Sequence, residues 1–350
     1  TSAPIWNYLF PDSPLFVYNR KGLVYNMEYR IRKRYKKKRR HFIRRVVISI
    51  VAVAVLILVG RKFTPNTAID LENLYSPYSI LTDLDSGNAL AEHNAQDRIY
   101  PASLTKIMTA ILAIENTQDM EEVITLPTDF FSKLYIENAS MAGFQPGEQV
   151  RLKDLLYGML LPSGAECCLA FCERIAGSEE AFVRLMNQKA GELGLENTHF
   201  CNSTGLHDSE HYSTVKDISA LLQYALKNET FRAAFTSSQY STLPSEQHPK
   251  GFTFYSTMFE CMESTKFTGG KIIGGKTGYT KEAGLCLASL AEINGKEVIL
   301  VTANADGTHQ TTPFHILDAM NVYRQMGESS VCYSSKFSPN GYLRKQFIIS

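Results

Sequence analysis

The pattern of apolar and polar positions predicts strands at both ends of the part of the chain that folds. These strands are expected over residues 78–85, 88–92, 271–278, 285–293 and 296–303. Ser86-Gly87 joins the first two as a tight turn, and Asn294-Gly295, a strong hairpin signal, joins the last two. We therefore expect antiparallel pairing at each end of this region.

Between the strands, apolar residues recur with the spacing of helices. Helices are predicted from residue 103, over residues 152–161, from residue 165, and over residues 179–193, 215–226 and 313–325. Pro162-Ser163-Gly164 interrupts the pattern, so Ser163 lies at a junction between two helices. Ser is a common helix N-cap, which is one role open to Ser163. Gly and Pro predict a loop at residues 143–147.

This order of elements favours an α+β fold. The terminal strands would share one antiparallel sheet flanked by helices, and a mostly helical subdomain would pack beside it. Ligands usually bind in clefts, and we expect one between the sheet and the helical block.

An apolar run at residues 46–60 lies outside this pattern, directly after a basic segment at residues 30–45. A basic run by itself also fits nucleic-acid binding. Basic residues directly before an apolar stretch follow the positive-inside rule, so we favour a membrane segment and expect no nucleic-acid partner. Arg61 and Lys62 follow at once, and no small-x-small cleavage site is evident. These features predict an uncleaved single-pass anchor.

The charge distribution supports this division of the chain. The first 62 residues carry fifteen Lys/Arg and two Asp/Glu, a balance of +13, and the remainder has a balance of −12. The basic charge therefore belongs to a segment and not to the fold. The predicted parts are an N-terminal region with a basic cytoplasmic segment at residues 1–45, a transmembrane helix at 46–60, a linker at 61–76, a folded domain at 77–326 and an unassigned tail at 327–350.

Cysteine and histidine spacing gives no sign of a metal site. Three of the seven cysteines lie within residues 167–172 of one predicted helix, without the C-x-x-C spacing of zinc ligands. We expect them to act as small buried apolar side chains. His207 and His211 are four residues apart, but Gly205 and short polar residues predict a loop there instead of a ligating helix. No cofactor is expected.

Candidate chemistry lies where the first helix begins, at Ser103 and Lys106. Residues three apart share a helix face, so the lysine amine can reach the serine hydroxyl. Serine must lose its proton during nucleophilic attack, and Lys106 can accept that proton only when neutral, which requires burial or a neighbouring positive charge. An ordinary amphipathic helix also fits this motif when it is taken alone.

Two further motifs favour a catalytic site over an ordinary amphipathic helix. They are Ser163 and the run Lys276-Thr277-Gly278. S-x-x-K with a second serine motif and K-T-G is typical of penicillin-binding proteins and class A β-lactamases. The sequence resembles the D-alanyl-D-alanine carboxypeptidases, the low-molecular-weight penicillin-binding proteins of serine peptidase family S11, over residues 77–325. The matching strings are residues 101–110, 143–147, 155–157, 161–164, 197–200, 204–206, 211–214 and 275–279.

The resemblance implies a β-lactamase/DD-peptidase-like fold and a serine D,D-carboxypeptidase. Such an enzyme removes the terminal D-alanine from peptidoglycan stem pentapeptides through an acyl-enzyme, needs no cofactor, and is inhibited covalently by β-lactam antibiotics. Ser103 would attack the carbonyl, Lys106 would accept its proton, and Ser163 would relay a proton between Lys106 and the leaving amine. With the predicted anchor, the catalytic domain would lie outside the cell membrane.

The resemblance also implies which residues bind the substrate. Lys276 would attract the terminal carboxylate and, as a second positive charge, help to keep the first lysine neutral. Thr277 would offer a hydroxyl to the same carboxylate, and Gly278 would allow the substrate backbone to approach. The backbone amides of Ser103 and Tyr279 would form the oxyanion hole.

One position departs from the family pattern. The second motif is usually Ser-x-Asn, whereas Ala165 stands at the third position here and Glu166 follows it. Glu166 either takes over part of the role of the missing amide or begins a helix, where acidic residues are favoured. Two other functions fit the motifs: a β-lactamase of the same fold, and a catalytically silent peptidoglycan-binding protein.

Overall fold

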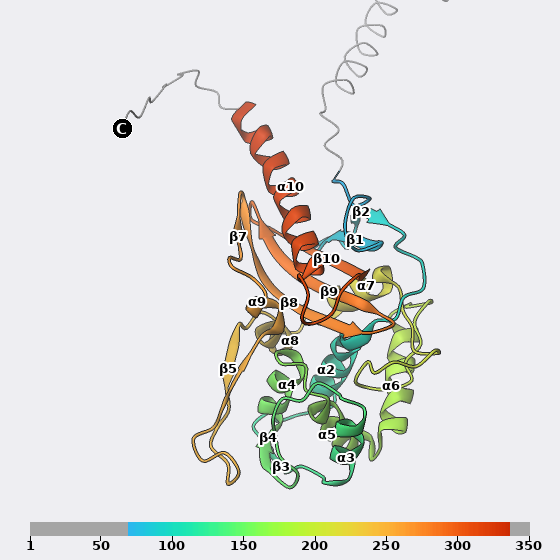
Figure 1. The fold of residues 1–350 in the computed structure, drawn as a ribbon, viewed down its shortest axis with the longest axis vertical. Helices are drawn as coiled ribbons and strands as arrows, with labels where there is room; N and C mark the ends of the chain where they lie inside the picture. The colour runs from blue at the N-terminus through green and yellow to red at the C-terminus, as the bar shows by residue number, and fades with distance from the viewer. Residues whose placement is uncertain (1–68, 337–350) are drawn as a thin grey trace, which may run out of the picture. The chain divides into compact units, whose positions relative to one another are not determined.

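A six-stranded antiparallel sheet is the central element of this computed structural model, which describes residues 69–336 (Figure 1). Its strand order is β2-β1-β10-β9-β8-β7. The strands are β1 (Tyr78–Asp83), β2 (Ala89–His93), β7 (Lys266–Phe267), β8 (Gly270–Thr280), β9 (Gly284–Ile293) and β10 (Lys296–Ala305). β1 pairs with β10, so the two ends of the domain share one sheet, as predicted.

The hairpin between β9 and β10 has the turn that its sequence predicts. Asn294 and Gly295 both have positive φ, 50° and 78°, as a type I′ turn requires. Ile293 lies opposite Lys296 directly after the turn. The turn therefore sets the register of the two long central strands.

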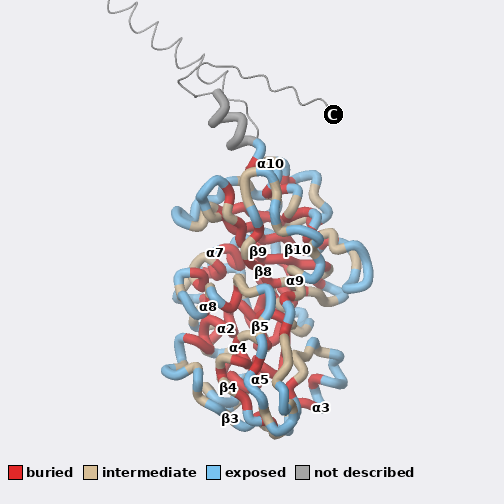
Figure 2. Tube along the Cα trace, turned by 90° about the vertical axis from the view of Figure 1, so that its left-hand side faces the viewer, coloured by how far each residue is buried: buried red, intermediate tan, exposed pale blue. Residues whose placement is uncertain are grey.

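Both faces of the sheet are buried. Along β10, Val298 and Leu300 pack with the helix α10 (Phe314–Lys336), whereas Ile299 and Val301 pack with the helical block, because successive strand residues point to opposite faces. Figure 2 shows the resulting buried band through the central strands and the helices beside them. The closing helix α10 extends to Lys336, beyond its predicted end at residue 325, and takes in part of the unassigned tail.

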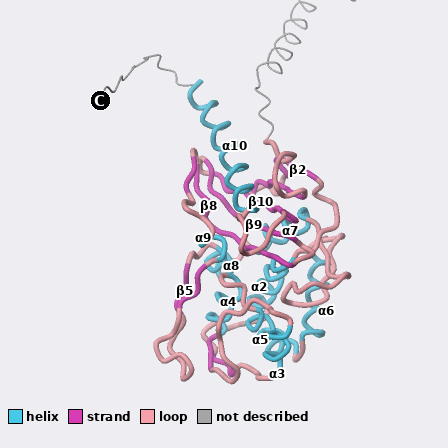
Figure 3. Tube along the Cα trace, viewed as in Figure 1, coloured by secondary structure: helices cyan, strands magenta, loops and turns pink. Residues whose placement is uncertain are grey.

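The helices between the strands form the other half of the domain (Figure 3). They are α2 (Lys106–Glu115), α3 (Asp129–Ile136), α4 (Leu152–Leu160), α5 (Ala165–Ala176), α6 (Glu179–Glu192), α7 (Val215–Ala225), α8 (Glu229–Phe235) and α9 (Thr257–Glu260). The predicted helices at α4, α5, α6 and α7 are confirmed. Short elements were not predicted: α3, α8, α9, the strand β7 and the strands β3 (Val123–Thr125), β4 (Gln149–Arg151), β5 (Gln239–Ser241) and β6 (Thr253–Tyr255).

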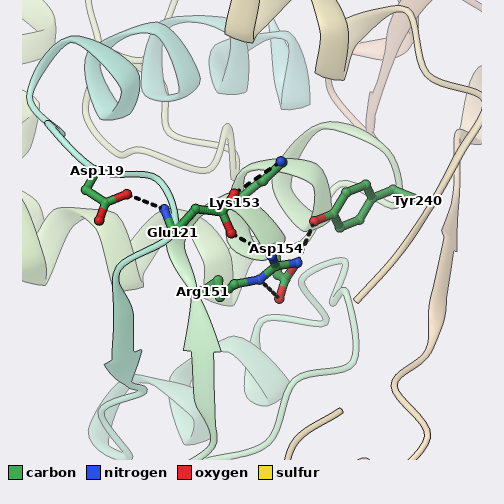
Figure 4. A network of polar contacts seen from close by, with 6 residues as sticks. All are labelled: Asp119, Glu121, Arg151, Lys153, Asp154 and Tyr240. Atoms are coloured by element: carbon green, nitrogen blue, oxygen red, sulfur yellow. Dashed lines mark hydrogen bonds and ion pairs between the residues drawn. The ribbon is translucent and has the colours of Figure 1, made fainter. Parts of the chain in front are cut away.

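A polar network joins the start of α4 to the β5–β6 hairpin (Figure 4). Arg151 donates to Asp154 at 2.8 Å and also pairs with Glu121 at 2.7 Å. Tyr240, from β5, donates its hydroxyl to the same Asp154 carboxylate at 2.7 Å. Asp154 is buried, so these partners compensate a charge that would otherwise be costly there.

The cysteines of α5 are buried side chains, as expected. Cys167, Cys168 and Cys172 are free thiols in the core of the helical block, and burial raises the pKa of each. They act as small apolar groups there.

Within residues 69–336, no helix is long and apolar enough to cross a bilayer. The basic segment and the predicted transmembrane helix at 46–60 lie outside the described residues.

Candidate active site

Ser103 and Lys106 come together at the start of the helical block. Ser103 lies in a 3-10 turn (Ala102–Thr105), and the α-helix α2 begins only at Lys106, so the prediction that the helix begins at Ser103 was wrong by three residues. The lysine Nζ donates to the serine Oγ at 3.1 Å and to the Thr204 carbonyl at 2.7 Å. The predicted pairing of hydroxyl and amine is therefore present.

Close backbone packing holds the turn that carries Ser103. Gly205 has a φ of +83°, and a Cβ there would lie 1.9 Å from the carbonyl oxygen of Ala102. Gly278 of β8 approaches from another direction, since its Cβ would lie 3.0 Å from the Ser103 nitrogen. A side chain at position 205 would displace the Ala102 carbonyl, and the contact at Gly278 is tighter than ordinary packing, so both positions hold the serine close to the strand edge.

A second serine–lysine pair lies beside the first. Lys276 of β8 donates to the Ser163 Oγ at 3.0 Å and to the Thr277 carbonyl at 2.7 Å. Ser163 does not cap α5, because Gly164 occupies the N-cap position, so the capping interpretation was wrong. Ser163 instead has a φ of +70°, which is strained for a residue with a Cβ. Its hydroxyl partner in the structure is Lys276 and not Lys106.

Burial favours the neutral form of both lysines. It is the main cause that lowers the pKa of Lys106, while the nearby Glu166 carboxylate acts in the opposite direction. Burial also lowers the pKa of Lys276, and the positive charge of Lys106 lowers it further. Lys106 must be neutral to act as a base, and desolvation is the main effect that favours its neutral form.

Glu166 does not replace the missing asparagine amide. Its Oε1 accepts the backbone N–H groups of Ala142 and Gly143 at 2.7 and 2.9 Å, and burial raises its pKa. The residue lies in the first turn of α5, as one interpretation expected, but it also holds this loop in place. Ala165 is among the residues that line the Ser103 cavity.

The residues around Ser103 enclose a cavity of about 460 Å³. Lys106 and Ala165 line it together with Tyr279, whose predicted oxyanion-hole role stays a prediction. Thr277 and Gly278 line an adjacent cavity. His309 lines both; it follows β10 in a polar loop, and no motif in the sequence indicated it.

His207 and His211, the two histidines four residues apart, contact aromatic and polar neighbours. The buried His211 contacts the Thr105 Oγ1 through Nε2 at 2.8 Å, and its Nδ1 accepts the Cys201 N–H at 3.1 Å. Burial lowers its pKa to about 4, so the ring is neutral and braces the serine-bearing turn. His207 packs edge-on against Tyr100. Among residues 69–336, no cluster of three metal-ligating side chains occurs.

Comparison with known proteins identifies relatives of this arrangement. The family model for D-alanyl-D-alanine carboxypeptidase matches residues 65–307. D-alanyl-D-alanine carboxypeptidase DacF of Bacillus subtilis is 35% identical over 227 residues, which cover 65% of this chain and 57% of that protein. The D-alanyl-D-alanine carboxypeptidase of Streptomyces sp. (strain K15) is 28% identical, over 73% of this chain and 90% of its own length.

Solved structures agree in fold. The crystal structure of the Streptomyces K15 DD-transpeptidase superposes with a TM-score of 0.66 at 26% identity, over 75% of this chain and all of that one. The chain spans a little over half the length of DacF and nearly all of the Streptomyces enzyme.

Proposed function

Because the chain belongs to the D-alanyl-D-alanine carboxypeptidase family, we propose that it is a serine D,D-carboxypeptidase that trims peptidoglycan stem pentapeptides. One observation carries the proposal most strongly. The Lys106 amine is buried, its pKa is lowered, and it lies 3.1 Å from the Ser103 hydroxyl. A neutral amine at this distance is the base that a serine nucleophile needs.

In the acylation step, Ser103 Oγ attacks the carbonyl carbon between the two terminal D-alanines while Lys106 takes the hydroxyl proton. The backbone amides of Ser103 and Tyr279 stabilise the developing oxyanion. Loss of one such donor typically costs about 2.7–4 kcal/mol of transition-state stabilisation. The C–N bond then breaks, the terminal D-alanine leaves, and water hydrolyses the remaining ester.

The Ser163–Lys276 pair serves the leaving group. The Ser163 hydroxyl accepts from Lys276, so its own proton is free to be donated to another acceptor. Ser163 then relays to the departing nitrogen the proton that Lys106 took from Ser103, so that Ser163 and Lys106 end the step as they began it. Lys276 and Thr277 form the side of the site that faces the substrate's terminal carboxylate.

Acylation by a labelled penicillin tests the proposed reaction. The purified protein should become labelled at Ser103, and Ser103→Ala should remove the label. D-alanine release from a pentapeptide should occur with wild type and stop after penicillin treatment. Rapid turnover of the penicillin without D-alanine release would instead identify a β-lactamase, and binding without either reaction would identify a silent peptidoglycan-binding protein.

We further propose that the enzyme acts at the outer face of a membrane to which residues 46–60 anchor it. The basic segment before that apolar run supports a cytoplasmic N-terminus. Peptidoglycan is then within reach of the catalytic domain.

A further inference from the structure

A second cavity lies beside Thr277, and the proposed reaction assigns no part of the substrate to it. It has a volume of about 390 Å³. Thr277 and Gly278 of β8 line it, together with Glu260 and Cys261 at the end of α9. The loop that follows β10 and the start of α10 close it. Since Thr277 faces the substrate's terminal carboxylate in the proposed reaction, this cavity receives the C-terminal residue of the substrate.

The groups that could bind a carboxylate here are limited. The Lys276 amine is 1% exposed and already donates to Ser163 and to the Thr277 carbonyl. The Thr277 hydroxyl contacts the Thr257 hydroxyl at 2.6 Å. Among the described residues that line this cavity, none is an arginine or a lysine. A carboxylate placed at Thr277 therefore needs a further donor.

Two histidines that line this cavity carry ring nitrogens that could serve as the further donor. His315 is 4% exposed, and its Nδ1 has no hydrogen-bond partner within residues 69–336, which is unusual for a buried polar atom. His309 packs edge-on against Tyr279, with ring centroids 4.8 Å apart. Of the described residues, His309 is the one that lines both this cavity and the Ser103 cavity. Its ring therefore lies between the acylated and the departing parts of a bound peptide.

We propose that His309 donates a hydrogen bond to the C-terminal carboxylate of the substrate and so makes the enzyme selective for peptides with a free C-terminus. The inference rests on the proposed function and names the substrate feature that the site recognises. Burial, and then the positive charge of Lys276, lower the pKa of His309, so its ring is neutral at neutral pH. A neutral imidazole still carries one N–H, which is sufficient for this bond.

The test compares a pentapeptide that ends in a free carboxylate with the same peptide ending in an amide. His309→Leu removes the donor, and His309→Gln keeps one. His207→Leu is the matched control, because His207 packs edge-on against Tyr100 at a similar distance and lines the Ser103 cavity but not the cavity beside Thr277. For each variant, thermal unfolding and titration with saturating labelled penicillin establish the folded, acylatable fraction.

We expect His309→Leu to reduce the preference for the free acid about tenfold, through a higher KM for that peptide, as the loss of a hydrogen bond to a charged group predicts. His309→Gln should restore most of the preference, and His207→Leu should leave it unchanged. An active wild type with an unchanged preference in His309→Leu would overturn this inference alone. A wild type that releases no D-alanine would overturn the proposed function and this inference together.

Discussion

At the scale of single residues, the site consists of two serine–lysine pairs with different environments. Ser103 is partly exposed and accepts from Lys106, whereas Ser163 is buried, has a left-handed backbone and accepts from Lys276. A strained residue persists only where its surroundings hold it. The strain at Ser163 therefore fits a hydroxyl whose position matters for the chemistry, in place of the helix cap that its sequence position suggested.

Glu166 allows the protonation of Lys106 to be tested. The Glu166 carboxylate raises the pKa of Lys106, against the larger effect of burial. Glu166→Gln removes that charge and keeps an oxygen for the N–H groups of Ala142 and Gly143. The Lys106 pKa should fall, so more of the amine is neutral at a given pH. We expect the acid limb of the pH profile of penicillin acylation to move to lower pH.

Glu148→Gln is the control for this measurement. Glu148 is equally buried, but its oxygens contact Gln145, Ser245 and His248 and none of the catalytic groups. Its substitution should leave the acid limb in place. A shift to higher pH in Glu166→Gln, or the same shift in both variants, would contradict the role given to Glu166.

At the scale of elements, the site depends on how closely the Ala102–Thr105 turn packs on its neighbours. Gly205→Ala would place a methyl group onto the Ala102 carbonyl and displace Ser103 from β8. Misplacement of a catalytic group by about 1 Å can cost on the order of a hundredfold in rate. We expect a loss of this size in penicillin acylation, measured on protein that remains folded.

Gly177→Ala is the control that separates loss of serine positioning from the cost of backbone strain alone. Gly177 also has a positive φ, 75°, at the end of α5, but no atom lies within 4 Å of the added Cβ. That variant should lose about 1 kcal/mol of stability and keep its acylation rate. Equal acylation rates in the two variants would show that the packing at Gly205 does not position the serine.

The elements also show what could be predicted from the sequence. Long helices such as α4 and α7, and the hairpin at Asn294-Gly295, carry their own local signals of apolar spacing, caps and turn residues. The three-residue strands β3 to β6 are too short for any periodicity, and tertiary pairing decides them. Motif spacing predicted Ser103, Lys106 and Lys276 as site residues, but a motif says nothing of His309, which only the folding of a loop brings to the cleft.

At the scale of the whole molecule, net charge divides the chain into two parts. The first 62 residues have a balance of +13 and the remainder −12. A basic segment can bind an anionic membrane by electrostatics alone, and salt screens that attraction. An inserted apolar segment is held by the hydrophobic effect and is not released by salt. The two modes of attachment can therefore be distinguished.

The full chain, incorporated into vesicles of mixed zwitterionic and anionic lipid, should resist extraction by high salt and by alkaline carbonate. Val53→Arg with Leu56→Arg places two charges within the apolar run and leaves residues 30–45 unchanged. Each charge costs about 2.5–3.5 kcal/mol at the centre of a membrane helix. The double variant should bind only at low salt, with penicillin acylation intact. Release of the wild-type chain by salt alone would contradict the anchor and leave electrostatic adsorption as the mode of attachment.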